Sequence, residues 1–148
     1  MNVYRSESIR LIRLATALVG VADAHDLVVD TVHRVVQRQD WSTIQEPGAY
    51  LTRALVNSAA ETRRSHGRRQ AREERAGRLR IVHVADAAMG IDVRRALQRL
   101  SVQQRAIAFL TYWEDLPIPE IARRLDVTEG TVRKQLARAK DRLREVLQ

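Results

Sequence analysis

The sequence has no cysteine, which excludes disulfide bonds, a thiol nucleophile and any cysteine-based zinc site. No apolar run approaches the roughly 20 residues that a membrane-spanning helix needs, and the first residues lack the apolar block of a signal peptide. We therefore expect a cytoplasmic protein without membrane insertion. Proline and glycine are few, with three and six among 148 residues, so the chain is long enough and varied enough for one ordinary domain or two small ones.

Lysine is also scarce, because Lys134 and Lys140 are the only two lysines among 26 basic residues. With 18 acidic residues the net charge is +8, which favours an anionic partner such as nucleic acid, and arginine suits phosphate and guanine well. The charge is uneven along the chain. Residues 1–62 carry a net charge of −1, residues 63–80 carry +6 and residues 81–148 carry +3.

Apolar residues recur three and four positions apart through most of the chain, which is typical of amphipathic helices. Gly20 is expected to end the first helix, and Asp23 is expected to cap the second. Residues 67–91 lack a lasting period, apart from an arginine-rich stretch that is open to a helical interpretation. The sequence therefore predicts an all-α protein of two small helical domains, residues 1–66 and 92–148, joined by a flexible linker over residues 67–91.

The strongest local pattern lies in residues 121–136, where a short helix, a turn and a second helix share apolar positions at fixed offsets. This spacing is typical of a helix-turn-helix. Thr128 stands where an N-cap belongs, and Asp126 occupies a turn position that usually carries glycine in a left-handed conformation. A basic outward face on the second helix could be ordinary solvated surface, but the spacing and the cap favour entry into a DNA groove. Its residues are Glu129, Gly130, Arg133, Lys134, Ala137 and Arg138.

Nearly the whole chain outside the linker resembles the extracytoplasmic-function (ECF) sigma factors of bacterial RNA polymerase. Residues 96–105, 112–122 and 130–143 resemble their region 4, with the motifs ALQRLSVQQR, YWEDLPIPEIA and GTVR followed by LARAKDRL. Residues 23–30 (DAHDLVVD), 47–57 (PGAYLTRALVN) and 61–69 resemble their region 2. Val29 and His25 depart from the polar residues that are common there.

The resemblance implies two DNA sites and one protein site. Region 4 would read the −35 element as duplex, with Arg133 and Lys134 on guanine edges. Ala137 would touch a thymine methyl or make room for a neighbouring base, and phosphates would be held by Arg105, Thr128, Thr131 and Arg138. The implied residues of region 4 are Arg105, Thr128, Glu129, Thr131, Arg133, Lys134, Ala137 and Arg138. Region 2 would hold the opened −10 element with Trp41, Ser42, Thr43, Asn57, Arg63, Arg64 and Arg68. The polymerase contacts would be Asp26, Leu27 and Asp30.

Several residues keep a second interpretation. Trp41 is either a platform for an unstacked base or an anchor of its loop, and Asp26 also suits a helix N-terminus. In the alternative, Asn57 is a satisfied polar side chain and Arg105 is a charge on a helix surface. The expected partners are core RNA polymerase and promoter DNA, and an anti-sigma factor is a further candidate. The alternatives are a stand-alone helix-turn-helix regulator and a sigma-like decoy without initiation activity.

The four histidines lack metal-ligand spacing, so no enzyme activity, metal or cofactor is expected.

Overall fold

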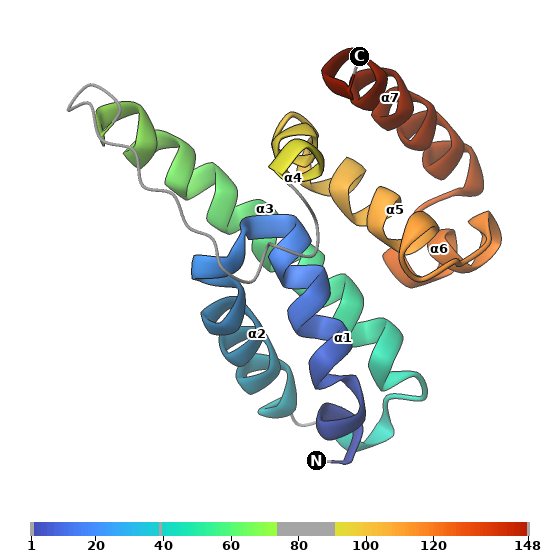
Figure 1. Ribbon diagram of the computed structural model, residues 1–148. Helices are drawn as coiled ribbons and strands as arrows, with labels where there is room; N and C mark the ends of the chain where they lie inside the picture. Colours follow the sequence, from blue (N-terminus) through green and yellow to red (C-terminus); the bar gives the residue numbers. More distant parts are fainter. Residues whose placement is uncertain (1, 39, 74–90, 148) are drawn as a thin grey trace.

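The computed structural model describes residues 2–38, 40–73 and 91–147, and over these ranges it contains helices and no strand. The predicted all-α fold is confirmed (Figure 1). No helix in these ranges has the length and apolar character to cross a membrane. The N-terminal half comprises α1 (Asn2–Val19), α2 (Val21–Val36), the short 3-10 helix η1 (Trp41–Thr43) and α3 (Pro47–Glu73). The C-terminal half comprises α4 (Ile91–Gln98), α5 (Val102–Tyr112), α6 (Ile118–Leu125) and α7 (Glu129–Leu147).

The junction between α1 and α2 is a single glycine. Gly20 ends α1 as predicted, and its φ of 92° lies in a region that glycine adopts without strain. Because the chain turns at Gly20 itself, α2 starts at Val21. The prediction that Asp23 caps α2 is therefore wrong, and Asp23 lies in the first turn, where its charge still suits the positive end of the helix dipole.

Helix α3 is longer than the sequence pattern indicates. It continues through Gly67 to Glu73, so the first seven residues of the predicted linker are helical. A single glycine inside a helix costs only about 1 kcal/mol, which the rest of a long helix offsets. Residues 74–90 of the predicted linker lie outside the described residues.

Capping interactions define the helices of the C-terminal half. Ser101 and Gln104 form a reciprocal capping box at the start of α5, with both hydrogen bonds at 3.1 Å. Asp126 has the left-handed conformation expected of this turn, with φ 57° and ψ 49°. The Thr128 hydroxyl accepts the backbone N–H of Thr131 at 3.1 Å, which confirms the predicted cap of α7.

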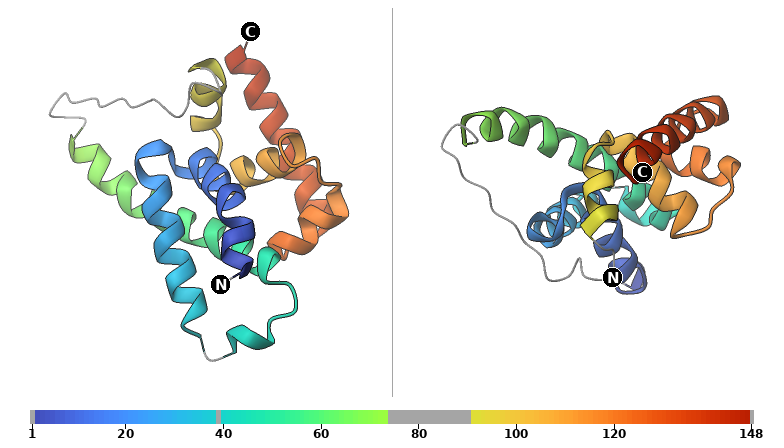
Figure 2. Two further views of the ribbon diagram at one scale, coloured as in Figure 1. Left: turned by 60° about the horizontal axis from the view of Figure 1, so that its bottom comes forward. Right: turned by 45° about the horizontal axis from the view of Figure 1, so that its top comes forward.

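The two halves pack against each other. One hydrophobic cluster joins Leu14 and Leu18 of α1 and Leu55 of α3 to Ile107 and Leu110 of α5. Both views in Figure 2 show α4–α7 gathered on one side of α1 and α3, while α2 lies farther from them. The described halves thus share a core, which apolar periodicity within each helix did not reveal.

Candidate nucleic-acid interface

The helix-turn-helix of α6 and α7 presents one basic face to solvent. Buried Ile121, Val132 and Leu136 fix α7 against its neighbours. This packing leaves a run of predicted contact residues exposed on the first half of α7: Glu129, Arg133, Lys134, Ala137 and Arg138. The structure therefore brings these predicted −35 residues together on one surface.

Two features at the start of α7 order this face. Arg133 donates to Glu129 one helical turn earlier at 3.2 Å, and both side chains are about half exposed or more. The hydroxyls of Thr128 and Thr131 lie 2.9 Å apart beside the first backbone N–H groups of the helix. A helix N-terminus with free N–H groups suits a phosphate oxygen. Arg133 is thus positioned by a weak partner that a base edge can replace.

Arg105 was predicted to hold a DNA phosphate, but the structure places it inside the molecule. Its side chain is 8% exposed and donates to the backbone carbonyl of Leu18 in α1 at 2.7 Å. Burial, followed by the positive charge of Arg63, lowers the pKa of Arg105 to about 10. Arg105 does not belong to the α7 face in this arrangement, and a DNA contact by Arg105 stays a prediction that requires the halves to separate.

The predicted −10 residues are divided between the surface and the contact between the halves. Ser42, Thr43, Asn57 and Arg64 are exposed. Trp41 is half-buried and packs against the hydrophobic core, which fits the interpretation as an anchor of its loop.

Arg63 is occupied by the C-terminal half. It donates to the carbonyl of Leu100 at 2.7 Å and to that of Gln98 at 3.3 Å, and burial lowers its pKa. The Arg68 side chain lies outside the described residues.

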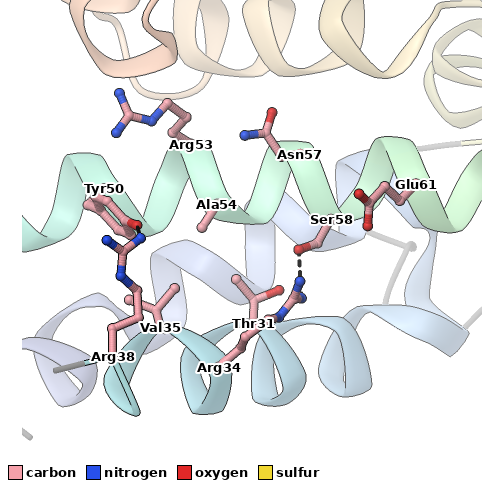
Figure 3. Close-up of a pocket in the computed structure, with 10 residues that line it drawn as sticks. All are labelled: Thr31, Arg34, Val35, Arg38, Tyr50, Arg53, Ala54, Asn57, Ser58 and Glu61. Carbon is pink, nitrogen blue, oxygen red and sulfur yellow. Dashed lines mark hydrogen bonds between the residues drawn. The ribbon is translucent and has the colours of Figure 1, made fainter. Parts of the chain in front are cut away.

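A polar pocket of about 250 Å³ lies along α2 and α3 and was not foreseen from the sequence (Figure 3). The ring of Tyr50 lies between two guanidinium groups, with Arg38 5.3 Å and Arg53 5.4 Å from its centroid. Arg34 donates to Ser58 at 2.9 Å, while Arg53 and Asn57 point away from α2. Its lining is Thr31, Arg34, Val35, Arg38, Tyr50, Arg53, Ala54, Asn57, Ser58 and Glu61.

The sequence held a signal for this pocket. Positions 50, 53, 54, 57, 58 and 61 follow a helical period, and every one of them lines the pocket. Only Asn57 among them was predicted as a functional residue.

The predicted polymerase contacts on α2 separate into two kinds. Asp26 and Asp30 are exposed on the helix. Leu27 is only 8% exposed and belongs to the hydrophobic core. It therefore packs on the buried side of α2 and is not part of its outer surface. Val29, at 42% exposed, is the apolar residue on the outer surface of this segment.

A metal site has no support in the described part of the chain, where no three His, Cys, Asp or Glu side chains gather closely enough to hold an ion. The arrangement offers basic and polar surfaces for binding.

Comparisons with known proteins agree with this geometry. The Sigma-70, region 4 family model matches residues 91–143. An RNA polymerase sigma-E factor of Streptomyces coelicolor is 32% identical, with 97% of this chain and 82% of that protein covered. An ECF RNA polymerase sigma factor SigM of Mycobacterium tuberculosis is 43% identical over 63 residues, which are 43% of this chain and 32% of that protein.

A solved structure shows the same fold over nearly all of this chain. The sigma factor RpoE of Bartonella quintana, in complex with the anti-sigma factor NepR, matches with a TM-score of 0.73 at 23% identity, covering 99% of this chain and 96% of that chain. Three observations agree on one family: the helix-turn-helix geometry, the match to the region 4 model, and the similarity of 97% of this chain to a sigma-E factor. This chain belongs to the ECF sigma factors of RNA polymerase.

Proposed function

We propose that this sigma factor contacts core RNA polymerase with α2, the −10 element with α3 and the −35 element with α7. The chain is an alternative sigma factor that directs transcription initiation, as its family membership shows. The observation that carries the assignment of surfaces is the basic face of α7, which an ordered helix-turn-helix projects into solvent. The protein also has a second, separate surface on α2 and α3. A stand-alone helix-turn-helix regulator does not need such a surface, so it argues against that alternative.

At the −35 element, the first half of α7 enters the major groove. Arg133 and Lys134 donate to guanine O6 and N7, and each good pair is worth about 1–3 kcal/mol of discrimination. Ala137 leaves room for a thymine methyl. Thr128 and Thr131 hold a phosphate at the helix N-terminus and thereby set the register.

At the −10 element, the pocket along α3 receives the opened strand. Single-stranded DNA is held by a positive groove combined with an aromatic surface on which bases stack. Tyr50, flanked by Arg38 and Arg53, offers both, and Asn57 adds donors and an acceptor for a base edge or phosphate. Ser42 and Thr43 line the neighbouring loop, and Arg64 contacts backbone upstream.

At the polymerase, exposed Asp26 and Asp30 attract basic side chains, and Val29 supplies apolar contact between them. We place the protein in the cytoplasm with the polymerase and regard it as a binding protein without enzymatic activity. An anti-sigma factor is a further candidate partner, because the similar RpoE structure contains one.

Transcription in vitro with purified core polymerase and a pool of promoter fragments tests the proposal. The protein should yield transcripts that start a fixed distance from a shared pair of motifs. Arg133→Ala should alter promoter choice, whereas Arg144→Ala, an exposed arginine near the other end of α7, should not. Asp26→Ala should weaken binding to core, with Asp141→Asn on α7 as the charge control. Tight binding to core without any transcripts would contradict the proposal and favour a decoy.

A further inference from the structure

Glu129 differs in charge from the rest of the −35 face of α7, because it is the only acidic residue in the set Glu129, Gly130, Arg133, Lys134, Ala137 and Arg138. The ligand of this face is a polyanion. A carboxylate here lowers the attraction to every phosphate nearby, whatever the DNA sequence. The face therefore carries one charge that weakens its own binding.

The fold itself has little use for this carboxylate. The Glu129 side chain is 48% exposed, so it fills no space in the core. Thr128 caps α7, because its hydroxyl accepts the backbone N–H of Thr131. A negative charge in the first turn suits the helix dipole, but the gain is small at an exposed position. The main consequence of Glu129 therefore concerns the surface that α7 presents.

The partner of Glu129 is Arg133, one helical turn later on the same face. Nη2 of Arg133 donates to Oε1 of Glu129 at 3.2 Å. An acid that precedes a base by four residues is the favourable order for such a pair in a helix. In the described part of α7, Arg133 makes no other hydrogen bond, and Lys134 and Arg138 form no ion pair. Glu129 thus holds Arg133 and leaves the two other cations free.

Holding a guanidinium group affects base contacts and phosphate contacts differently. Guanine O6 and N7 need a pair of aligned N–H donors, and the fork of Arg133 retains such a pair when another of its hydrogens faces Glu129. A side chain that is already held loses less conformational entropy when it meets the base. A phosphate contact depends more on charge than on direction, and the carboxylate partly offsets that charge.

We propose that Glu129 is a positioning residue for Arg133, which raises the discrimination of the −35 contact and lowers its affinity for DNA of any sequence. The inference rests on the proposed function, because it takes Arg133 as a reader of guanine. Specificity is a difference between affinities, so a charge that weakens binding to all sequences improves it only where the correct sequence loses less. The aligned donors of Arg133 supply that difference.

A pool of promoter duplexes randomised over the −35 element tests the proposal when it is presented to the protein bound to core polymerase. Base frequencies among the bound duplexes give the preference at each position, and Arg133→Ala identifies the position that Arg133 reads. Glu129→Ala should lower the guanine preference there about two- to fivefold, the range of one exposed ion pair. Binding to the pool as a whole should rise by a similar factor, and added salt should reduce this gain.

Glu129→Gln separates the charge from the hydrogen bond, because glutamine is neutral but keeps an oxygen that accepts from Arg133. Overall binding should rise as much as in Glu129→Ala, whereas the guanine preference should lie between that variant and the parent. Asp141→Asn is the matched control, since Asp141 pairs with Arg144 at 3.6 Å on an exposed part of the same helix. It should leave the base preferences unchanged. Thermal melting curves of all these variants should coincide with that of the parent, so a purely structural role would not produce this pattern.

The double variant Glu129→Ala/Arg133→Ala shows whether Glu129 acts through Arg133. Its base preferences should equal those of Arg133→Ala alone. A further loss of preference in the double variant would mean that Glu129 accepts from a base itself, for example from cytosine N4, and would overturn the proposal.

The same experiment distinguishes this inference from the proposed function. If Arg133→Ala alters the base preferences and Glu129→Ala does not, the positioning role is overturned and the proposed function stands. If Arg133→Ala leaves the preferences unchanged, the proposed −35 contact is contradicted and the role of Glu129 is overturned with it.

Discussion

Two sets of arginines in this molecule have the same chemistry and opposite surroundings. On α7, Arg133 is 61% exposed and Arg138 is exposed beside it, whereas Arg105 is 8% exposed at the contact between the halves. Arg133 has a carboxylate one turn away, and Arg105 has only a backbone carbonyl. Arg133 and Arg138 are accessible from solvent, whereas Arg105 holds the two halves together.

The difference shows that residue type alone does not identify a DNA contact. The position of a guanidinium group relative to helix ends and to the core decides whether it meets solvent or protein. Substitutions that affect one set and spare the other are therefore the sharpest way to examine this comparison.

The largest effect on stability is expected from a substitution in the hydrophobic core that joins the two halves. Leu110→Ala should lower the free energy of unfolding by about 2–5 kcal/mol, because it removes a fully buried side chain from the cluster that joins the halves. Ile9→Ala, at a position 67% exposed, is the apolar control and should change it by less than about 0.5 kcal/mol. Urea unfolding followed by circular dichroism measures both. Equal losses would show that the shared core is not formed.

Arg105→Ala should come next in its effect on stability. The free energy of unfolding should fall by about 1–3 kcal/mol, because the Leu18 carbonyl loses its partner in a buried site. Arg105→Met retains most of the apolar stem and removes the poorly paired charge, so its loss should be smaller. If Arg105→Ala proves as harmless in thermal unfolding as Arg133→Ala, the buried position of Arg105 is refuted.

Arg133→Ala should show the opposite profile. The free energy of unfolding should change by less than about 0.5 kcal/mol, since the side chain is exposed and its ion pair with Glu129 is weak. Preference for the cognate −35 sequence should fall by about 1–3 kcal/mol in competition binding at constant salt. The neighbouring control Arg144→Ala should keep that preference, and a uniform loss across all sequences would assign Arg133 to phosphate instead.

The smallest expected effect is a dependence of the free energy of unfolding on pH. Arg123 and Arg124 donate to Glu120 in α6 and lower the pKa of its carboxyl to about 2. The unfolded chain binds this proton at its ordinary value near 4.5, so the stabilisation is present above that pH and is lost as the pH falls toward 2. Glu120→Gln should remove this part of the acid sensitivity in a pH series of melting temperatures. An unchanged pH profile would contradict the pairing.

Local features could be predicted from the sequence with good accuracy. The Thr128 cap, the end of α1 at Gly20 and the left-handed turn at Asp126 all depend on residues within a few positions of each other. The outward face of α7 follows from the same short-range periodicity, because its buried apolar side carries Val132 and Leu136.

Features that depend on contacts between distant segments could not be predicted in this way. A helical period shows that Leu27 and Arg105 lie on certain faces, but it does not say that those faces are covered by other helices. The helical period of positions 50–61 marks only the α3 side of the pocket of Tyr50 and Arg38, and the pocket itself forms where α2 and the residues after it meet α3. Similarity to a family suggests which residues face DNA in a complex. The structure of the free protein shows where those residues lie before DNA is present.

The central claim is that α3 serves the −10 element and α7 the −35 element in one molecule, so that the packed halves of this structure must separate at a promoter. The most direct measurement is the distance between labels at Arg13→Cys and Lys140→Cys in a transcribing complex with core polymerase and promoter DNA. We predict that the distance between the labels is longer by tens of ångströms than in the free protein. By their names the two elements lie about 25 base pairs apart, which is roughly 85 Å at about 3.4 Å per pair. A complex that transcribes with the compact distance unchanged would contradict the account.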